Sequence, residues 1–240
     1  MSSRSAAIAA RFDARACDYE RHASLQRAVA ERLATLLPDL QKPRVLEIGC
    51  GTGLFSRHLL ARYEGGTFLF SDLAPAMLDE CRRNLGDASS GVSFETALPD
   101  GPRTYATFDL VALSMSRHWF PDPQATLASL RRRIAPGGKI IYATLGPESF
   151  TEWRAVLAKQ GLRSGLVSLP EIPGVVEEER LTPDTSTLGF LRRMKSVGGI
   201  TPREAYRPLT AGALHRAIRA ADARFGGKIT WHIVYGVLEV

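Results

Sequence analysis

The segment that most constrains the fold of this 240-residue chain is a short apolar run that enters a glycine-rich turn, Val45-Leu46-Glu47-Ile48-Gly49-Cys50-Gly51-Thr52-Gly53. An amphipathic stretch, 54–62, follows the turn, and a second apolar run, 68–70, leads to Asp72. A strand, a glycine turn, a helix and a second strand ending in an acid form the front half of a nucleoside-binding βαβ unit. The glycines let the backbone turn tightly and approach a ligand closely. Asp72 is placed to accept hydrogen bonds from both hydroxyls of a ribose.

The spacing of the glycines separates two classes of nucleoside cofactor. The turn reads G-x-G-x-G, with Glu47 two residues before its first glycine, whereas the dinucleotide fingerprint is G-x-G-x-x-G, with a third glycine beside a pyrophosphate. The pattern E-x-G-x-G-x-G resembles motif I of the class I S-adenosylmethionine (SAM) methyltransferases, in which no phosphate is cradled. SAM is therefore favoured over NAD. The alternative is a turn that only joins a strand to a helix and binds no ligand. The position of Asp72 at the end of the next strand argues against it.

Length and composition indicate one α/β domain with a sizeable core, since 45% of the residues are hydrophobic. No apolar run is long enough to span a bilayer, and residues 1–10 do not resemble a secretory signal. Cys17, Cys50 and Cys81 lack C-x-x-C spacing, which predicts a reduced, cytoplasmic protein without disulfides or a zinc site. The net charge of +6 fits either a generic solvated surface or an acidic partner.

The hydrophobic periodicity predicts an α/β fold with a mostly parallel sheet, helices on both faces and an antiparallel C-terminal strand. Together with the resemblance to motif I, it implies the Rossmann-like sheet of a class I methyltransferase. We expect a single domain over 1–240, with an N-terminal helical cap at 1–42 and a lid or substrate insertion at 146–183. The cap holds two helices broken near 22–24. The predicted strands are 45–48, 68–70, 91–94, 107–114, 139–144, 175–181 and 229–238; the predicted helices are 54–62, 75–85, 126–134, 149–159, 185–196 and 210–225. Pro136-Gly137-Gly138 is expected to stop the third of these helices.

Four stretches carry a more specific resemblance. They are Arg11-Phe12-Asp13-Ala14-Arg15-Ala16-Cys17-Asp18-Tyr19-Glu20-Arg21-His22-Ala23-Ser24-Leu25-Gln26, then Thr144-Leu145-Gly146-Pro147-Glu148-Ser149-Phe150-Thr151-Glu152-Trp153, then Leu191-Arg192-Arg193-Met194-Lys195-Ser196-Val197-Gly198-Gly199, and the closing Trp231-His232-Ile233-Val234-Tyr235-Gly236-Val237. They resemble segments of the malonyl-acyl-carrier-protein O-methyltransferases of biotin synthesis, over nearly the whole chain. The resemblance implies SAM as cofactor, acyl carrier protein as partner, and methylation of the free carboxylate of a malonyl thioester.

Two stretches depart from that family's pattern. The family usually has G-D-x-E-x-L-P before the fourth strand, where the aspartate reaches the adenine amine, but this chain reads Ser93-Phe94-Glu95-Thr96-Ala97-Leu98-Pro99. Glu95 or Thr96 is the expected substitute. The family's S-N-L-x-x-Q-W after the fourth strand reads Ser114-Met115-Ser116-Arg117-His118-Trp119, which keeps the tryptophan but neither the asparagine nor the glutamine.

The site residues follow from placement at the carboxyl ends of the strands. The predicted cofactor-binding residues are Glu47, Gly49, Gly51, Gly53, Asp72, Leu73, Leu98, Ser114 and Arg15. Leu73 and Leu98 flank the adenine, Glu47 orients the turn and faces the methionyl ammonium, and Ser114 offers its carbonyl to that ammonium. On the acceptor side we predict Tyr19, Trp119 and His118. The alternatives are a core tyrosine, a core tryptophan and an exposed loop histidine. Arg15 and Arg117 are candidates to pair with a carboxylate of the cofactor or acceptor.

The chemistry needs neither a metal nor a general base. A carboxylate acceptor has an ordinary pKa of about 4 and is already ionised at neutral pH. Positioning and desolvation then supply the catalysis. An acidic carrier protein would dock on Arg131-Arg132-Arg133 or on Arg192, Arg193 and Lys195, although a solvated helix face explains the first cluster equally well.

Other functions remain open at this point. They are methylation of another small carboxylic acid or a quinone-like ring, a non-catalytic SAM-binding subunit, and RNA methylation. The chain has no aromatic-studded basic stretch and no N-P-P-Y motif, so we expect no nucleic-acid partner and no membrane partner.

Overall fold

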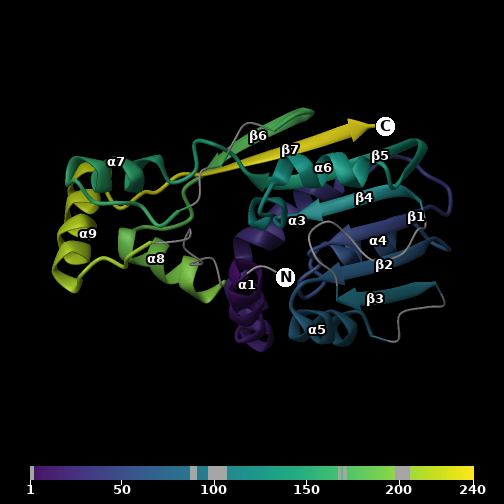
Figure 1. Cartoon of the computed structure of the whole chain (residues 1–240), viewed down its shortest axis with the longest axis horizontal. Coiled ribbons are helices and arrows are strands. Elements are labelled where there is room, and N and C mark those ends of the chain that lie inside the picture. Colours follow the sequence, from purple (N-terminus) through teal and green to yellow (C-terminus); the bar gives the residue numbers. More distant parts are fainter. Residues whose placement is uncertain (1–2, 87–90, 97–106, 167–168, 170–171, 198–205) are drawn as a thin grey trace.

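The computed structural model describes residues 3–86, 91–96, 107–166, 169, 172–197 and 206–240. Its centre is a seven-stranded sheet with the strand order β3-β2-β1-β4-β5-β7-β6. The strands are β1 (Arg44–Ile48), β2 (Thr67–Asp72), β3 (Val92–Thr96), β4 (Phe108–Ser114), β5 (Ile134–Leu145), β6 (Val175–Leu181) and β7 (Trp231–Glu239). The first five strands pair in parallel, and β7 runs antiparallel to both β5 and β6 (Figure 1). The expected antiparallel C-terminal strand is thereby confirmed.

Helices cover both faces of the parallel part of the sheet. The helices of the described residues are α1 (Ser3–Asp13), α2 (Tyr19–His22), α3 (Ser24–Ala34), α4 (Ser56–Arg62), α5 (Pro75–Leu85), α6 (Pro123–Arg131), α7 (Thr151–Lys159), α8 (Thr187–Ser196) and α9 (Ala211–Phe225), with short 3-10 turns η1 (Ala16–Asp18) and η2 (Arg117–Trp119). Residues alternate in direction along a strand, so one face packs against α3, α4 and α5 and the other against α6. Strands buried on both faces read as continuous apolar runs, which explains why the sequence revealed them.

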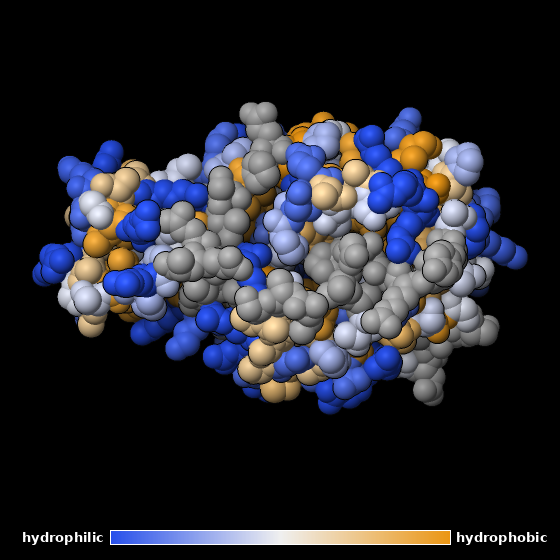
Figure 2. All heavy atoms as spheres, in the orientation of Figure 1, coloured by the Kyte–Doolittle hydropathy of each residue, from blue (hydrophilic) through white to orange (hydrophobic). Residues whose placement is uncertain are grey.

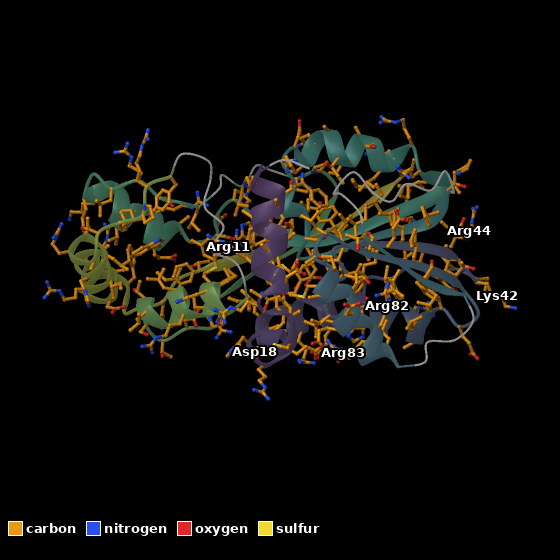
Figure 3. The ribbon with its side chains drawn as sticks, turned by 60° about the horizontal axis from the view of Figure 1, so that its bottom comes forward. Arg11, Asp18, Lys42, Arg44, Arg82 and Arg83 are labelled. Carbon is orange, nitrogen blue, oxygen red and sulfur yellow. The ribbon has the colours of Figure 1, made fainter. Side chains whose placement is uncertain are left out.

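The N-terminal segment lies across the ends of the strands. Figure 3 shows Lys42 and Arg44 at the amino ends of the strands, and Arg11 and Asp18 of the N-terminal segment toward the opposite, carboxyl ends. The predicted break near 22–24 falls at Ala23, but the segment is also interrupted after α1, before η1. This position places the N-terminal segment over the edge where parallel sheets bind their ligands.

The predicted helix 126–134 is displaced in the structure, and the predicted turn after it is wrong. Asp122 accepts hydrogen bonds from the backbone nitrogens of Gln124 and Ala125, so α6 starts at Pro123 and ends at Arg131. Residues 136–138 lie inside β5, where the pairing with β4 shifts register. Gly137, at φ +77°, donates its N–H to the carbonyl of Val240. The Pro-Gly-Gly segment therefore forms an irregularity that pairs with the chain's end.

Helices α7, α8 and α9 form a lobe beside the sheet, at the left of Figure 1, joined to it through β5 and β7. In Figure 2 the surface of this lobe mixes hydrophilic residues with hydrophobic ones. Within the described ranges, none of the helices combines the length and the apolar run needed to cross a bilayer.

Gly236 of β7, which pairs with Tyr142 of β5, leads to a prediction about stability. A Cβ at Gly236 would lie 2.1 Å from Cζ and Oη of Tyr142, a fully buried ring that donates its hydroxyl to the carbonyl of Pro173. We expect Gly236→Ala to lower the free energy of unfolding by about 2–3 kcal/mol, because this ring has no room to move. Urea unfolding measures the loss. Gly212→Ala in α9, whose Cβ would meet only Nη1 of Arg216 at 3.6 Å, is the control and should not lose stability. Equal effects of the two substitutions would refute the packing argument.

Candidate functional site

The turn after β1 is held by the end of β2. The backbone nitrogens of Gly49 and Cys50 both donate to the carbonyl of Ser71, at 2.7 and 3.0 Å. The next nitrogen, of Gly51, donates to Oδ2 of Asp72 at 2.9 Å. Three successive N–H groups thus point at one strand end, which fixes the turn in the sharp form that its positive φ angles require.

Asp72 holds the turn in place and is also the residue predicted to bind the ribose hydroxyls. Its Oδ1 accepts the N–H of Ala74 at 2.9 Å while its Oδ2 accepts that of Gly51. Burial raises the pKa of Asp72, and hydrogen bonds from the backbone of Ala74, Gly51 and Leu73 oppose that rise. Each carboxylate oxygen has two lone pairs, so both keep one for a further donor.

The surroundings that a Cβ would meet differ among the three glycines of the turn. A Cβ at Gly49 would lie 2.4 Å from Cβ of Ser116, and one at Gly53 would lie 3.1 Å from Sγ of Cys81. At Gly51 a Cβ would meet nothing within 4 Å. Gly49 therefore permits close packing against the loop after β4, Gly53 permits packing of α5, and Gly51 faces open space.

Glu47 is buried beneath the turn. Its Oε2 accepts the hydroxyl of Ser56 at 2.6 Å, while its Oε1 is buried without a hydrogen-bond partner. Burial raises the pKa of Glu47 to about 8; the Ser56 bond acts in the opposite direction, and the Asp72 charge adds to the rise. An unsatisfied buried carboxylate oxygen is costly, so it marks a place where a donor is missing.

This pKa predicts how stability depends on pH. Between about pH 4.5 and pH 8 the folded chain keeps a proton on Glu47 that the unfolded chain has released, so this group's contribution to stability falls as pH rises and levels off above pH 8. Glu47→Gln cannot ionise and should therefore gain stability relative to the wild type as pH rises from 5 to 8. Urea midpoints of both proteins at pH 5, 6.5 and 8 measure the difference. A difference that stays constant over that range would contradict the assigned pKa.

A cavity of about 170 Å³ opens at the turn and extends under the N-terminal segment and the lobe. It brings together nine of the twelve predicted site residues: Tyr19, Glu47, Gly49, Gly51, Asp72, Leu73, Ser114, His118 and Trp119. They come from the N-terminal segment and from the ends of β1, β2 and β4. Convergence of three strand ends at one cavity is the arrangement expected of a ligand site in an open parallel sheet.

Tyr19 and Trp119 lie in one aromatic group over the cavity. Phe12 packs edge-on against Trp119, with ring centroids 5.5 Å apart, and lies 6.4 Å from the ring of Tyr19. Burial, followed by the charges of Asp72 and Glu20, raises the pKa of Tyr19 well above its ordinary value. Tyr19 therefore stays protonated and is available as a hydroxyl donor.

His118 is half-buried and lines the cavity, so the alternative of an exposed loop histidine is wrong. Its Nδ1 lies 3.3 Å from Oγ1 of Thr144. Burial, and then the charges of Arg117 and Arg4, lowers the pKa of His118 to about 3. The ring is therefore neutral at physiological pH. The sequence did not show this because η2 is folded back onto β5 by contacts that are distant along the chain.

Of the predicted cofactor residues that the structure describes, two are not among the cavity's lining. Arg15 is half-buried and does not line it, and Gly53 packs against α5 instead. Leu98 lies outside the described residues. Arg117, predicted as a partner for a carboxylate, does not line the cavity either; it is 2% exposed, and its Nε and Nη2 have no hydrogen-bond partner.

Sequence reasoning expected a lid at 146–183 but named no lining residue of the wall that this segment, the α8 region and Trp231 contribute. That wall contains Phe150, Arg154, Leu166, Leu169, Met194, Val197 and Trp231. It also missed Met115, which follows β4 with φ +54° and lines the cavity. A left-handed conformation at a methionine is uncommon and often marks a functional site, but no local sequence signal announces it. Among the described residues, no group of three or more His, Cys, Asp or Glu side chains is arranged to hold a metal ion.

Comparison with known protein structures supports the architecture. The N-methyltransferase NodS of Bradyrhizobium japonicum, solved with S-adenosylhomocysteine, superposes with a TM-score of 0.57 at 11% identity over 97% of each chain. The YcgJ protein of Bacillus subtilis superposes with a TM-score of 0.59 at 13% identity over 88% of this chain and 97% of that one. At such identities the likeness concerns the fold alone, which is that of the class I methyltransferases.

Comparison of sequences identifies the family. A profile described as "Methyltransferase domain" matches residues 46–140. The malonyl-[acyl-carrier protein] O-methyltransferase of Magnetococcus marinus is 37% identical over 92% of this chain and 88% of its own length. That of Enterobacter lignolyticus is 31% identical over 97% and 96%. The biotin biosynthesis bifunctional protein BioCD of Bordetella avium is 39% identical over 95% of this chain and 51% of its own length. The chain therefore belongs to the malonyl-[acyl-carrier protein] O-methyltransferase family.

Proposed function

We propose that this chain transfers the methyl group of SAM to the free carboxylate of malonyl-acyl-carrier protein, an early step of biotin synthesis. The membership of the chain in a family of that name supports the proposal. The observation that carries it is a cavity whose floor is the Asp72-braced glycine turn and whose far wall, formed by the lobe, is largely apolar. Such a cavity can hold a nucleoside cofactor at one end and an acyl group at the other.

The residues present fit SAM. Gly51 leaves open space where a ligand can approach the backbone, and Asp72 has free lone pairs for the two ribose hydroxyls. Oε1 of Glu47, buried without a partner, is suited to the methionyl ammonium. Leu73 supplies an apolar surface for the adenine. When bound, SAM supplies an electrophilic methyl group on a sulfonium.

The residue that replaces the family's adenine-contacting aspartate is best sought at the end of β3. Thr96 is the register partner of Asp72, so it ends its strand beside the proposed ribose site. Glu95 pairs one position earlier, with Ser71. We therefore assign the adenine contact to Thr96 rather than to Glu95.

The reaction needs positioning more than proton transfer. A carboxylate oxygen of the acceptor would form the new bond to the methyl carbon as the carbon–sulfur bond broke, and the electron pair of that bond would stay on sulfur. No proton changes place, which agrees with a neutral His118 and a protonated Tyr19 in the cavity. These residues and Trp119 would orient the acceptor and exclude water, and correct orientation can supply about 7–11 kcal/mol.

Residues from both ranges in which the sequence predicts a cap and a lid line the cavity. Residues 1–42 supply lining residues from α1 to α3, and the segment 146–183 supplies Phe150, Arg154, Leu166 and Leu169. We propose that the second segment encloses the acyl group of the acceptor.

The basic surface beside the lobe is the proposed docking place for an acidic carrier protein. Met194 and Val197 of the α8 region line the cavity, while Arg192 and Lys195 of the same helix are exposed. Arg193 is already paired with Asp184 at 3.0 Å. The alternative cluster at 131–133 follows α6, which covers the other face of the sheet and lies away from α8 in Figure 1. A pantetheine arm can therefore reach the cavity from the α8 side.

A labelled-methyl assay tests the function. The chain is incubated with methyl-labelled SAM and with malonyl-acyl-carrier protein, malonyl-coenzyme A or free malonate, and the methyl ester is identified by mass spectrometry. We expect the ester on the carrier protein to form fastest. Methylation of only a small free acid, or of a quinone-like ring, would reject the carrier-protein substrate. Failure to restore growth of a biotin auxotroph lacking this enzyme would place the chain in another pathway.

A further inference from the structure

The lining of the cavity has an uneven distribution of charge. The two carboxyl groups, Glu47 and Asp72, belong to the glycine-turn end. Of the described residues that line the cavity, Arg154 is the one with a permanently cationic side chain, and it belongs to the lobe. His118 also lines the cavity but is neutral. An anionic acceptor entering this space therefore meets a single fixed cation among the described lining residues, and the lobe rather than the glycine turn supplies it.

The local structure directs Arg154 to the cavity. It lies in the first turn of α7, and its backbone nitrogen donates to the carbonyl of Phe150, the residue just before the helix, at 3.0 Å. Both side chains line the cavity. Phe150 packs edge-on against Trp231, with centroids 4.8 Å apart, and both rings line the cavity. Nε1 of Trp231 is buried without a hydrogen-bond partner. The wall therefore presents a guanidinium and an indole N–H within aromatic surroundings.

The side chains of this wall suit a ligand that carries a carboxylate. Burial lowers the pKa of Arg154, because its charge is partly removed from water. A bound anion would compensate that loss of solvation, and a guanidinium matches the geometry of a carboxylate. A methyl ester carries no charge and cannot compensate it. The same wall thus favours an acid over its ester.

We propose that Arg154 is the receptor for the acceptor's free carboxylate and makes the enzyme prefer its acidic substrate to its esterified product. This assignment rests on the proposed function. Arg154 would hold one carboxylate oxygen in a charge-assisted hydrogen bond and leave the other oxygen to attack the methyl group. Once the ester forms, the charge that Arg154 binds is gone, and the product leaves more readily.

Binding measurements test the assignment without requiring turnover. The dissociation constants of malonyl-pantetheine and of its methyl ester are measured by calorimetry on the whole chain saturated with S-adenosylhomocysteine. The wild type should bind the acid about 10- to 100-fold more tightly than the ester, the range expected for a hydrogen bond between charged groups. Arg154→Met should lose this preference while its binding of the ester changes little.

Two variants serve as controls. Lys159→Met removes an exposed charge from the same helix and should keep the wild-type preference. Arg154→Gln, which keeps a polar side chain at the position, answers the same question if Arg154→Met no longer binds S-adenosylhomocysteine. A preference for the acid that persists in the Arg154 variants overturns the assignment.

The outcomes separate this assignment from the function. If the wild type prefers the acid and Arg154→Met does not, but no methyl is transferred to malonyl-acyl-carrier protein, the proposed function fails and the Arg154 site stands. If the wild type methylates the carrier protein and Arg154→Met still prefers the acid, the function stands and the Arg154 site is wrong.

Discussion

Asp72→Asn is expected to weaken SAM binding by about 100-fold or more, because two hydrogen bonds to a charged acceptor are each worth about 1.5–3 kcal/mol. The carboxylate faces donors on all sides: the backbone nitrogens of Gly51 and Ala74, each at 2.9 Å, and the proposed ribose hydroxyls. An asparagine amide places an NH₂ group where one of these donors needs an acceptor. The substitution therefore weakens the hydrogen bonds that hold the glycine turn. It also removes the carboxylate that accepts hydrogen bonds from the proposed ribose hydroxyls.

Calorimetry with SAM and with S-adenosylhomocysteine measures this effect, and urea unfolding shows whether the fold survives. We expect it to survive, since burial already raises the pKa of Asp72 and so disfavours its charge. Asp79→Asn is the matched control: it removes an acid from α5 that pairs with Arg82 at the surface, and it should bind SAM normally. A dissociation constant for Asp72→Asn within threefold of the wild type would exclude Asp72 from the ribose site.

Glu20→Ala is expected to weaken SAM binding by about 10- to 30-fold, because Glu20 ties the N-terminal segment to the elements around the turn. Its Oε1 accepts hydrogen bonds from Oγ1 of Thr52 at 3.1 Å, Nη2 of Arg57 at 2.8 Å and Nδ2 of Asn84 at 3.2 Å. Its Oε2 pairs with Arg27 at 3.2 Å. One carboxylate thus joins α2 to α3, α4, α5 and the glycine turn.

Loss of this connection should act mainly on the rate at which SAM leaves. Tyr19 and Phe12 line the cavity from the same segment, so a loosened segment uncovers the cofactor. Stopped-flow displacement of SAM should show faster dissociation, with only a small change in the free energy of unfolding, because Glu20 remains partly exposed to solvent. Glu20→Gln should have an intermediate effect. Glu31→Ala, an exposed acid on α3, is the control. Unchanged dissociation in Glu20→Ala would show that the segment is held by its apolar contacts alone.

Features read from local spacing were predicted well. The helix at Pro75–Leu85 and the strand at Val175–Leu181 have the predicted bounds, and the remaining strands begin or end within a few residues of those expected, apart from the earlier start of β5. Strand periodicity, an N1 proline and a glycine turn depend on neighbours in the chain, so the sequence expresses them directly. The prediction for the Pro-Gly-Gly segment was wrong because the same residues that stop a helix can also bend a strand. Here hydrogen bonds between 137–138 and Val240 hold the segment in β5.

By itself the sequence determined the order of strands and helices, the glycine turn with Asp72, and the family, because each of these is written in short spacings along the chain. Only the tertiary structure decided which side chains surround the cavity. It buried His118 against Thr144, turned Gly53 toward α5, left Arg15 and Arg117 out of the lining and brought Arg154 in. The physical reason is that a cavity wall is made of contacts between residues far apart in the chain. Such contacts depend on how the lobe and the N-terminal segment pack on the sheet, and no local pattern encodes that packing.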